Sequence, residues 1–130
     1  MLRSVINSID ESAVETDLGR SFFHMEDFPE ELESKLVKHV ESLTGKRLKL
    51  TGRALSTYDG KYGQPSLFPH LDRNDTAYIF DYQYESNITW PVIVESVEYP
   101  LKDNEALLLA GKTQVHWRPK RKFEDGEFVS

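Results

Sequence analysis

The apolar residues of the chain follow two periods, one helical and one extended. Between residues 29 and 44, Leu32, Leu36, Val40 and Leu43 recur at helical steps, which predicts an amphipathic helix. Proline suits the first turn of such a helix, and Gly45 is a typical C-terminal cap. A second, short helix is expected near residues 4–8.

After Gly45 the pattern changes to short extended runs rich in β-branched and aromatic residues. One helix followed by six to eight short strands predicts a mainly β protein, folded as a β-sandwich or a jelly roll. The length of 130 residues suggests one domain, with a helical part at 1–46 and a β core at 47–130. The last expected strand reaches Ser130 and is therefore expected to be very short or truncated. The strands are expected at residues 47–58, 67–72, 76–84, 90–101, 105–109, 114–118 and 127–130.

Composition narrows the chemistry. The chain has no cysteine, which excludes disulfides, thiolate nucleophiles and cysteine zinc sites, so any metal must bind imidazole and carboxylate groups. A net charge of -6 argues against nucleic acid as a partner. One basic run, residues 118–122, is either a solvated loop or a binding site for an anion.

No targeting or membrane segment is evident. The N-terminal residues carry acidic side chains early and lack the apolar run of a signal peptide. No apolar run approaches the ~18 residues that a membrane-spanning helix needs. We therefore expect a cytoplasmic protein without membrane contact.

Three residues form a candidate metal site. His70 and Asp72 are two residues apart in an expected strand, so their side chains point to the same face. His116 lies in a later expected strand that can face them. Two histidines and one carboxylate form the facial triad of non-haem iron(II) oxygenases, which leaves open positions for a cosubstrate and O₂.

With these residues the chain resembles the superfamily of oxygenases that depend on 2-oxoglutarate and iron(II), nearest to its prolyl-hydroxylase-like branch. The resemblance covers roughly residues 48–130. It is carried by the segments RALSTY at 53–58, GQPSLFPHLDR at 63–73, WPVIV at 90–94, NEALLLAG at 104–111 and HWR at 116–118.

The resemblance implies a double-stranded β-helix, which is a cupin-like jelly roll, with iron(II) held by His70, Asp72 and His116. It also implies oxidative decarboxylation of 2-oxoglutarate coupled to hydroxylation by O₂. The implied substrate is a small molecule, an amino acid or a peptide side chain. No motif names that substrate, and none indicates the oligomeric state.

One position departs from the family pattern. Phe128 stands where many members carry the arginine or lysine that pairs with the far carboxylate of 2-oxoglutarate. Arg118 is the first candidate for that role, because it lies two residues beyond His116 and faces the same side of a strand. The other candidates for binding the cosubstrate are Arg73, Arg53 and Lys120, with Tyr58 and Tyr78 as hydrogen-bonding residues.

Three alternatives stay open at this point. The protein is an iron enzyme whose substrate itself chelates the metal, a non-catalytic jelly-roll binding module, or a cupin with different metal chemistry. Nucleophilic hydrolysis and nucleotide binding are disfavoured, because the chain has no Gly-x-Ser-x-Gly elbow and no glycine-rich phosphate loop.

Overall fold

The computed structural model describes residues 2–7 and 13–130, and its regular structure is mainly β. Two α-helices, α1 (Leu2–Asn7) and α2 (Glu30–Thr44), and one short 3₁₀ turn, η1 (Gly60–Tyr62), accompany the strands. Within the described residues, no helix has both the length and the apolar character to cross a membrane. The strands are β1 (Val14–Glu15), β2 (Arg20–His24), β3 (Ala54–Asp59), β4 (Leu67–His70), β5 (Ile79–Tyr82), β6 (Val92–Val94), β7 (Val97–Tyr99), β8 (Ala106–Leu109), β9 (His116–Arg118) and β10 (Phe128–Val129).

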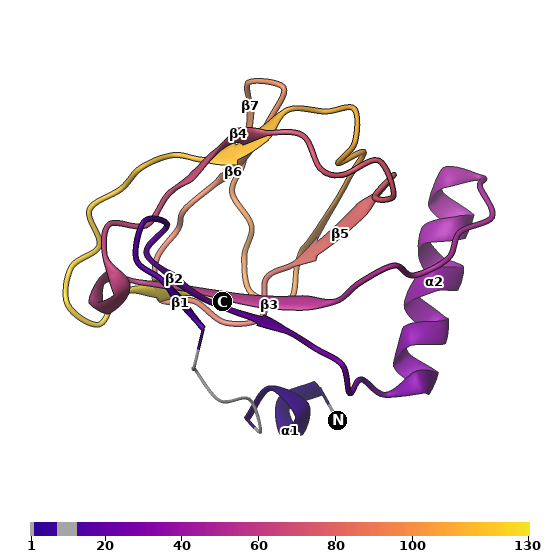
Figure 1. The fold of residues 1–130 in the computed structure, drawn as a ribbon, viewed down its shortest axis with the longest axis horizontal. Coiled ribbons are helices and arrows are strands. Elements are labelled where there is room, and N and C mark those ends of the chain that lie inside the picture. The colour runs from indigo at the N-terminus through magenta and orange to yellow at the C-terminus, as the bar shows by residue number, and fades with distance from the viewer. Residues whose placement is uncertain (1, 8–12) are drawn as a thin grey trace.

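The strands form three antiparallel sheets. The first has the order β1-β2-β3-β10, the second β4-β9-β6-β7, and the third pairs β5 with β8. Figure 1 shows β3 along the lower side of the molecule and β4 and β6 along the upper side, with α2 at one end.

Strand β10 joins the first sheet to the segment that follows β5. On one side its residue Val129 pairs with Tyr58 of β3. On the other side, Ser130 N donates to Glu85 O at 2.8 Å, and Asn87 N donates to Phe128 O at 3.2 Å. The end of the chain is therefore hydrogen-bonded on both sides.

The predicted helix is confirmed as α2, which begins one residue later than expected. Three glutamates occupy its first turn, where negative charge favours the helix dipole. Gly45 ends the helix in the left-handed conformation, with φ 67°, and its N–H donates to Glu41 O at 2.9 Å. The short helix expected at residues 4–8 overlaps α1, and Ser8 lies outside the described residues.

Most strands lie where the sequence predicts them, but their lengths differ from the predicted lengths. The part at 1–46 was expected to be helical, and it also contributes the strands β1 and β2. The strand expected at 47–58 begins only at Ala54, where pairing with β2 starts. The strand expected at 90–101 is a hairpin of β6 and β7, whose turn residues Glu95 and Ser96 have positive φ. The sheets confirm a mainly β chain with an N-terminal helix.

The core contains two clusters of buried side chains. In one cluster, the ring of Trp90, which is 1% exposed, packs edge-on against Tyr58 at 4.9 Å and Phe123 at 5.2 Å, and Val129 completes it. The other cluster is built on β6 and β8, and it consists of Val92, Val94, Leu101 and Leu109 with Ile79 and Leu107 packed against them.

Candidate metal centre

Pairing of β4 with β9 brings the two histidines of the predicted site together. His70 and His116 are direct partners in the antiparallel register, and their ring centroids lie 4.2 Å apart. The alternation of β9 turns His116 and Arg118 to the interior, where both are buried, and leaves Trp117 on the opposite face. The chain continues from β4 to Asp72, which completes the group.

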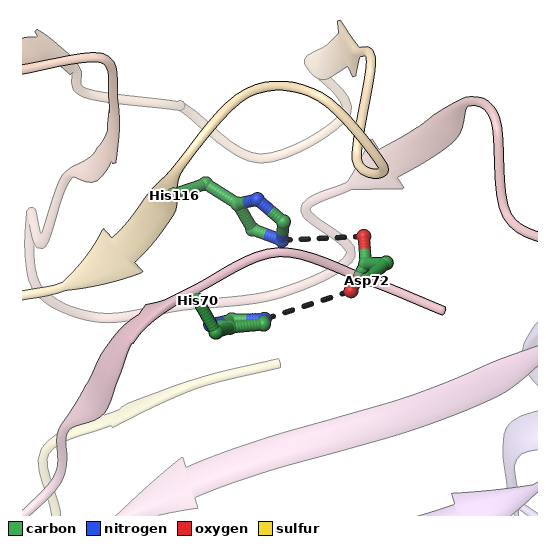
Figure 2. A group of neighbouring side chains, drawn as sticks. All are labelled: His70, Asp72 and His116. Atoms are coloured by element: carbon green, nitrogen blue, oxygen red, sulfur yellow. Dashed lines mark ion pairs between the residues drawn. The ribbon is translucent and has the colours of Figure 1, made fainter. Parts of the chain in front are cut away.

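The carboxylate of Asp72 lies between the two imidazoles, as Figure 2 shows. His70 Nε2 is 3.6 Å from Asp72 Oδ1, and His116 Nε2 is 3.4 Å from Asp72 Oδ2. One ligand atom from each residue can be chosen so that all three lie within 4.8 Å of one another. The structure therefore brings the three predicted residues together.

The other nitrogen of each ring lies against a backbone carbonyl, which orients the ring. His70 Nδ1 is 2.7 Å from Phe68 O, and His116 Nδ1 is 2.9 Å from Gln114 O. A backbone carbonyl only accepts hydrogen bonds, so each Nδ1 carries the proton. In the neutral form of each ring, Nε2 then offers its lone pair on the side of the carboxylate, which is the arrangement of a metal-binding histidine.

The buried oxygen of the Asp72 carboxylate, Oδ2, has no hydrogen-bond donor among the described residues. A buried carboxylate oxygen without a donor is costly, and two neutral imidazole lone pairs do not relieve that cost. A cation at the centre of the three ligand atoms would satisfy all of them, so the donor set fits a divalent metal.

Gly111 positions this carboxylate, and sequence reasoning did not single it out as functional. Asp72 N donates to Gly111 O at 2.9 Å. This hydrogen bond joins the loop after β4, which carries Asp72, to the segment after β8. A Cβ at Gly111 would overlap Asp72 Oδ2 and lie 2.9 Å from Ile79 Cδ1. Only glycine leaves room for the carboxylate in its present place.

Arg118 is a buried cation beside the site. It is 8% exposed, donates through Nη1 to Trp90 O at 3.1 Å, and stacks over the rings of Trp90 and Tyr58 at 4.8 and 5.4 Å. Within residues 2–7 and 13–130, no carboxylate forms an ion pair with it. Its partners among the described residues are therefore a backbone carbonyl and two aromatic rings.

Tyr58 lies between two arginines. Its hydroxyl accepts a hydrogen bond from Arg20 Nη1 at 3.2 Å, and the Arg118 guanidinium stacks on its ring. Burial raises the pKa of the Tyr58 phenol, although the charges of Arg20 and Arg118 act to lower it. The phenol therefore stays protonated at neutral pH and keeps a proton to donate. Sequence reasoning missed Arg20, because the strand that carries it was not predicted.

The remaining predicted residues lie elsewhere or make other contacts. Arg53 bonds to Glu33 of α2 at 2.9 Å and to the carbonyl of Met25 at 2.7 Å. Arg73 is largely exposed and pairs with Asp75. Lys120 is exposed, and Tyr78 is half-buried just before β5. Among the described residues, no hydrogen bond or ring contact joins any of these four to the triad.

Strand β10 turns Val129, and not Phe128, towards the Trp90 cluster. Val129, not Phe128, pairs with Tyr58 and enters the Trp90 cluster with 1% exposure, so Phe128 faces the other side of the sheet. The inward position of this strand is therefore valine. The buried cation that packs on Trp90 of this cluster is Arg118, which lies on β9.

Comparison with known proteins adds no assignment. No protein-family model matches the chain, no curated protein matches it, and no solved structure matches it. The family resemblance therefore remains a prediction from the residues themselves.

Proposed function

We propose that the protein is an iron(II)- and 2-oxoglutarate-dependent dioxygenase that hydroxylates a small molecule, an amino acid or a peptide side chain. The observation that carries this proposal is the triad, in which ligand atoms of two imidazoles and one carboxylate lie within 4.8 Å of one another, and the buried carboxylate oxygen has no donor among the described residues. Two histidines and one carboxylate on one side of a metal suit iron(II) and leave the other side open.

The strand arrangement supports a double-stranded β-helix as the proposed fold. In one sheet the order β4-β9-β6-β7 puts both histidine strands side by side. Opposite it, β10 lies between β3 and the segment that continues β5. This gives two facing layers of antiparallel strands with the triad on the inner side.

Each residue of the site has a distinct role in the proposed reaction. His70, Asp72 and His116 would hold the metal, and Gly111 keeps the carboxylate in place. Bound iron(II) would supply the activation of O₂ that couples decarboxylation of the oxoacid to hydroxylation.

Arg118 is the proposed anchor for the far carboxylate of 2-oxoglutarate. It faces the same side of β9 as His116, about 6.6 Å along the strand, which suits an acid that chelates the metal through its other end. The neutral Tyr58 hydroxyl is a second donor for that carboxylate. Trp90 and Val129 would exclude water from that ion pair. The cytoplasm, where both cosubstrates are present, remains the proposed compartment.

The test is an anaerobic titration of the metal-free protein with iron(II) and then with 2-oxoglutarate. We expect a weak visible charge-transfer band only when both are present, and loss of the band in His70→Ala and Asp72→Ala. His39→Ala is the matched control, because His39 is exposed on α2. Absence of iron binding would contradict the proposal and favour a non-catalytic binding module.

A second variant tests the cosubstrate. Arg118→Met removes the charge at similar volume and should weaken 2-oxoglutarate binding by about tenfold to a hundredfold, the loss of one charge-assisted pair. Exposed Arg47→Met is the control. Iron binding without any 2-oxoglutarate band would instead support an enzyme whose substrate chelates the metal, as the apolar Val129 on β10 would allow.

A further inference from the structure

Arg20 and Tyr58 lie side by side on one face of the first sheet. They are direct partners in the antiparallel register of β2 and β3, so their side chains project on the same side. Val129, the partner of Tyr58 on its other flank, lies in the cluster of Trp90. The Arg20 side chain is 14% exposed. The register therefore places a largely buried guanidinium beside a buried phenol.

The contacts of Arg20 hold its guanidinium against the phenol oxygen. Nη1 donates to the Tyr58 hydroxyl at 3.2 Å. Nη2 donates to both carboxylate oxygens of Glu15 at 3.4 Å, and the guanidinium lies over the Phe22 ring at 4.6 Å. An ion pair and a ring contact thus fix the group that donates to Tyr58.

The phenol of Tyr58 has a proton that this hydrogen bond does not use. Its oxygen accepts from Arg20, so its own O–H needs a different acceptor. Burial raises the pKa of the phenol, so the proton is retained at neutral pH. Within the part of the chain that the structure describes, no side chain or carbonyl accepts it. Tyr58 is 4% exposed, and a buried donor normally has an acceptor, so this O–H indicates a ligand.

Arg118 is a second, independent indication of an anionic ligand at the same ring. Its guanidinium carbon is 5.4 Å from the centroid of the Tyr58 ring, close to the 5.8 Å of Arg20. Arg118 is 8% exposed, and no carboxylate of a described residue pairs with it. A ligand carboxylate beside Tyr58 would pair with this buried charge and also accept the phenol proton.

We propose that Arg20 is a positioning residue for 2-oxoglutarate, because it holds the Tyr58 hydroxyl with its proton towards the carboxylate that pairs with Arg118. With Nη1 on one side of the oxygen, the O–H points away from Arg20. Arg20 thus acts through Tyr58 and does not itself touch the ligand. The identity of the ligand rests on the proposed function, whereas the hydrogen bond from Arg20 to Tyr58 requires neither metal nor ligand.

A double-mutant cycle separates this role from a structural one. The dissociation constant of 2-oxoglutarate is measured anaerobically in the iron(II) protein through the charge-transfer band. Arg20→Met and Tyr58→Phe should each weaken binding about tenfold, the effect of one hydrogen bond to a charged group. In the Tyr58→Phe background, Arg20→Met should add less than about twofold, because the hydroxyl through which Arg20 acts is gone. Arg20→Lys keeps a charged donor and should restore most of the affinity, and exposed Arg47→Met is the control.

A second readout needs no iron. With tyrosine labelled with ¹³C at Cζ, the NMR signal that is lost in Tyr58→Phe identifies Tyr58. Addition of 2-oxoglutarate to the metal-free protein should shift this signal, because the ligand accepts the phenol proton. At the same ligand concentration, the shift should be smaller in Arg20→Met and unchanged in Arg47→Met.

Two results would overturn this role of Arg20: unchanged affinity in Arg20→Met, or an equal loss of affinity with and without the Tyr58 hydroxyl. Either result leaves the proposed oxygenase standing, because the charge-transfer band still forms. A shift of the Tyr58 signal without any charge-transfer band would overturn the oxygenase and retain an anion site that Arg20 supports. Absence of both the band and the shift would overturn both proposals.

Discussion

At the scale of single residues, the candidate centre depends on a glycine at position 111. Gly111 has no Cβ, and that space is taken by Asp72 Oδ2 and the end of the Ile79 side chain. We expect Gly111→Ala to push the carboxylate away from the two Nε2 atoms and to lower metal affinity. Loss of a supporting contact of this kind typically costs about tenfold to a hundredfold. A cobalt(II) titration followed by visible absorption measures the change.

Gly52→Ala is the matched control for that variant. No atom lies within 4 Å of a Cβ built on Gly52, and its φ is not in the left-handed region. The control should bind cobalt(II) like the unchanged protein. If Gly111→Ala also keeps full affinity while folding normally, Asp72 is not the ligand that the geometry indicates.

At the scale of elements, a polar network fixes the turn before β8 to the segment after β5. Ser86 Oγ donates to Asp103 Oδ1 at 2.6 Å, and Gln83 Nε2 donates to the same oxygen at 3.3 Å. These bonds favour the charged carboxylate, so they lower the pKa of Asp103 below its ordinary value of 3.8, with the Ser86 hydroxyl as the largest cause.

This network predicts a pH effect with a definite sign. Because the folded pKa of Asp103 is lowered, its stabilisation is present above pH 3.8 and is lost as pH falls through the lowered value. Ser86→Ala should move the Asp103 pKa up towards 3.8 in a carboxyl ¹³C NMR titration. Ser42→Ala, an exposed serine on α2, should not move it, and an unchanged Asp103 pKa in Ser86→Ala would show that the hydroxyl is not its cause.

The sequence predicts some elements better than others. An element is predicted well when its signals lie within its own residues, and poorly when it depends on pairing with a distant segment. Helix α2 was predicted to within one residue, because its stripe, acidic first turn and glycine cap are all local signals. Strand β2 was missed, because Arg20, Phe22 and His24 share one face and mix charged, apolar and polar side chains. Its existence depends on pairing with β3, which no local pattern reveals.

The same reasoning explains the site. The spacing of His70 and Asp72 on an extended segment gave their common direction, and the position of His116 in a later strand completed the triad. Gly111 and Arg20 act through contacts with residues distant in sequence, Asp72 and Tyr58, so their roles follow only from the folded chain. Phe128 was predicted to stand where family members carry their cation, and the register of β10, which pairs Val129 with Tyr58, also follows only from the folded chain.

At the scale of the whole molecule, metal binding and folding should be coupled. The three ligand atoms come from the end of β4, the loop after it and β9, so they converge only when the second sheet has formed. A metal that binds only the folded chain stabilises it by mass action, by about 2.7 kcal/mol at a free concentration one hundred times the Kd. For a domain of this size that corresponds to a rise in Tm of roughly 10 °C.

Cobalt(II), which resists oxidation by air, is the probe for this coupling. We expect thermal unfolding followed by circular dichroism to show a Tm that rises with cobalt(II) in the unchanged protein and in His39→Ala. His116→Ala should unfold at a lower temperature without metal, because a buried ring is lost, and its Tm should not respond to cobalt(II). The metal-dependent change in Tm, rather than Tm itself, separates a ligand from a residue that only fills the core. An equal rise in His116→Ala would place the cobalt(II) site elsewhere on the chain.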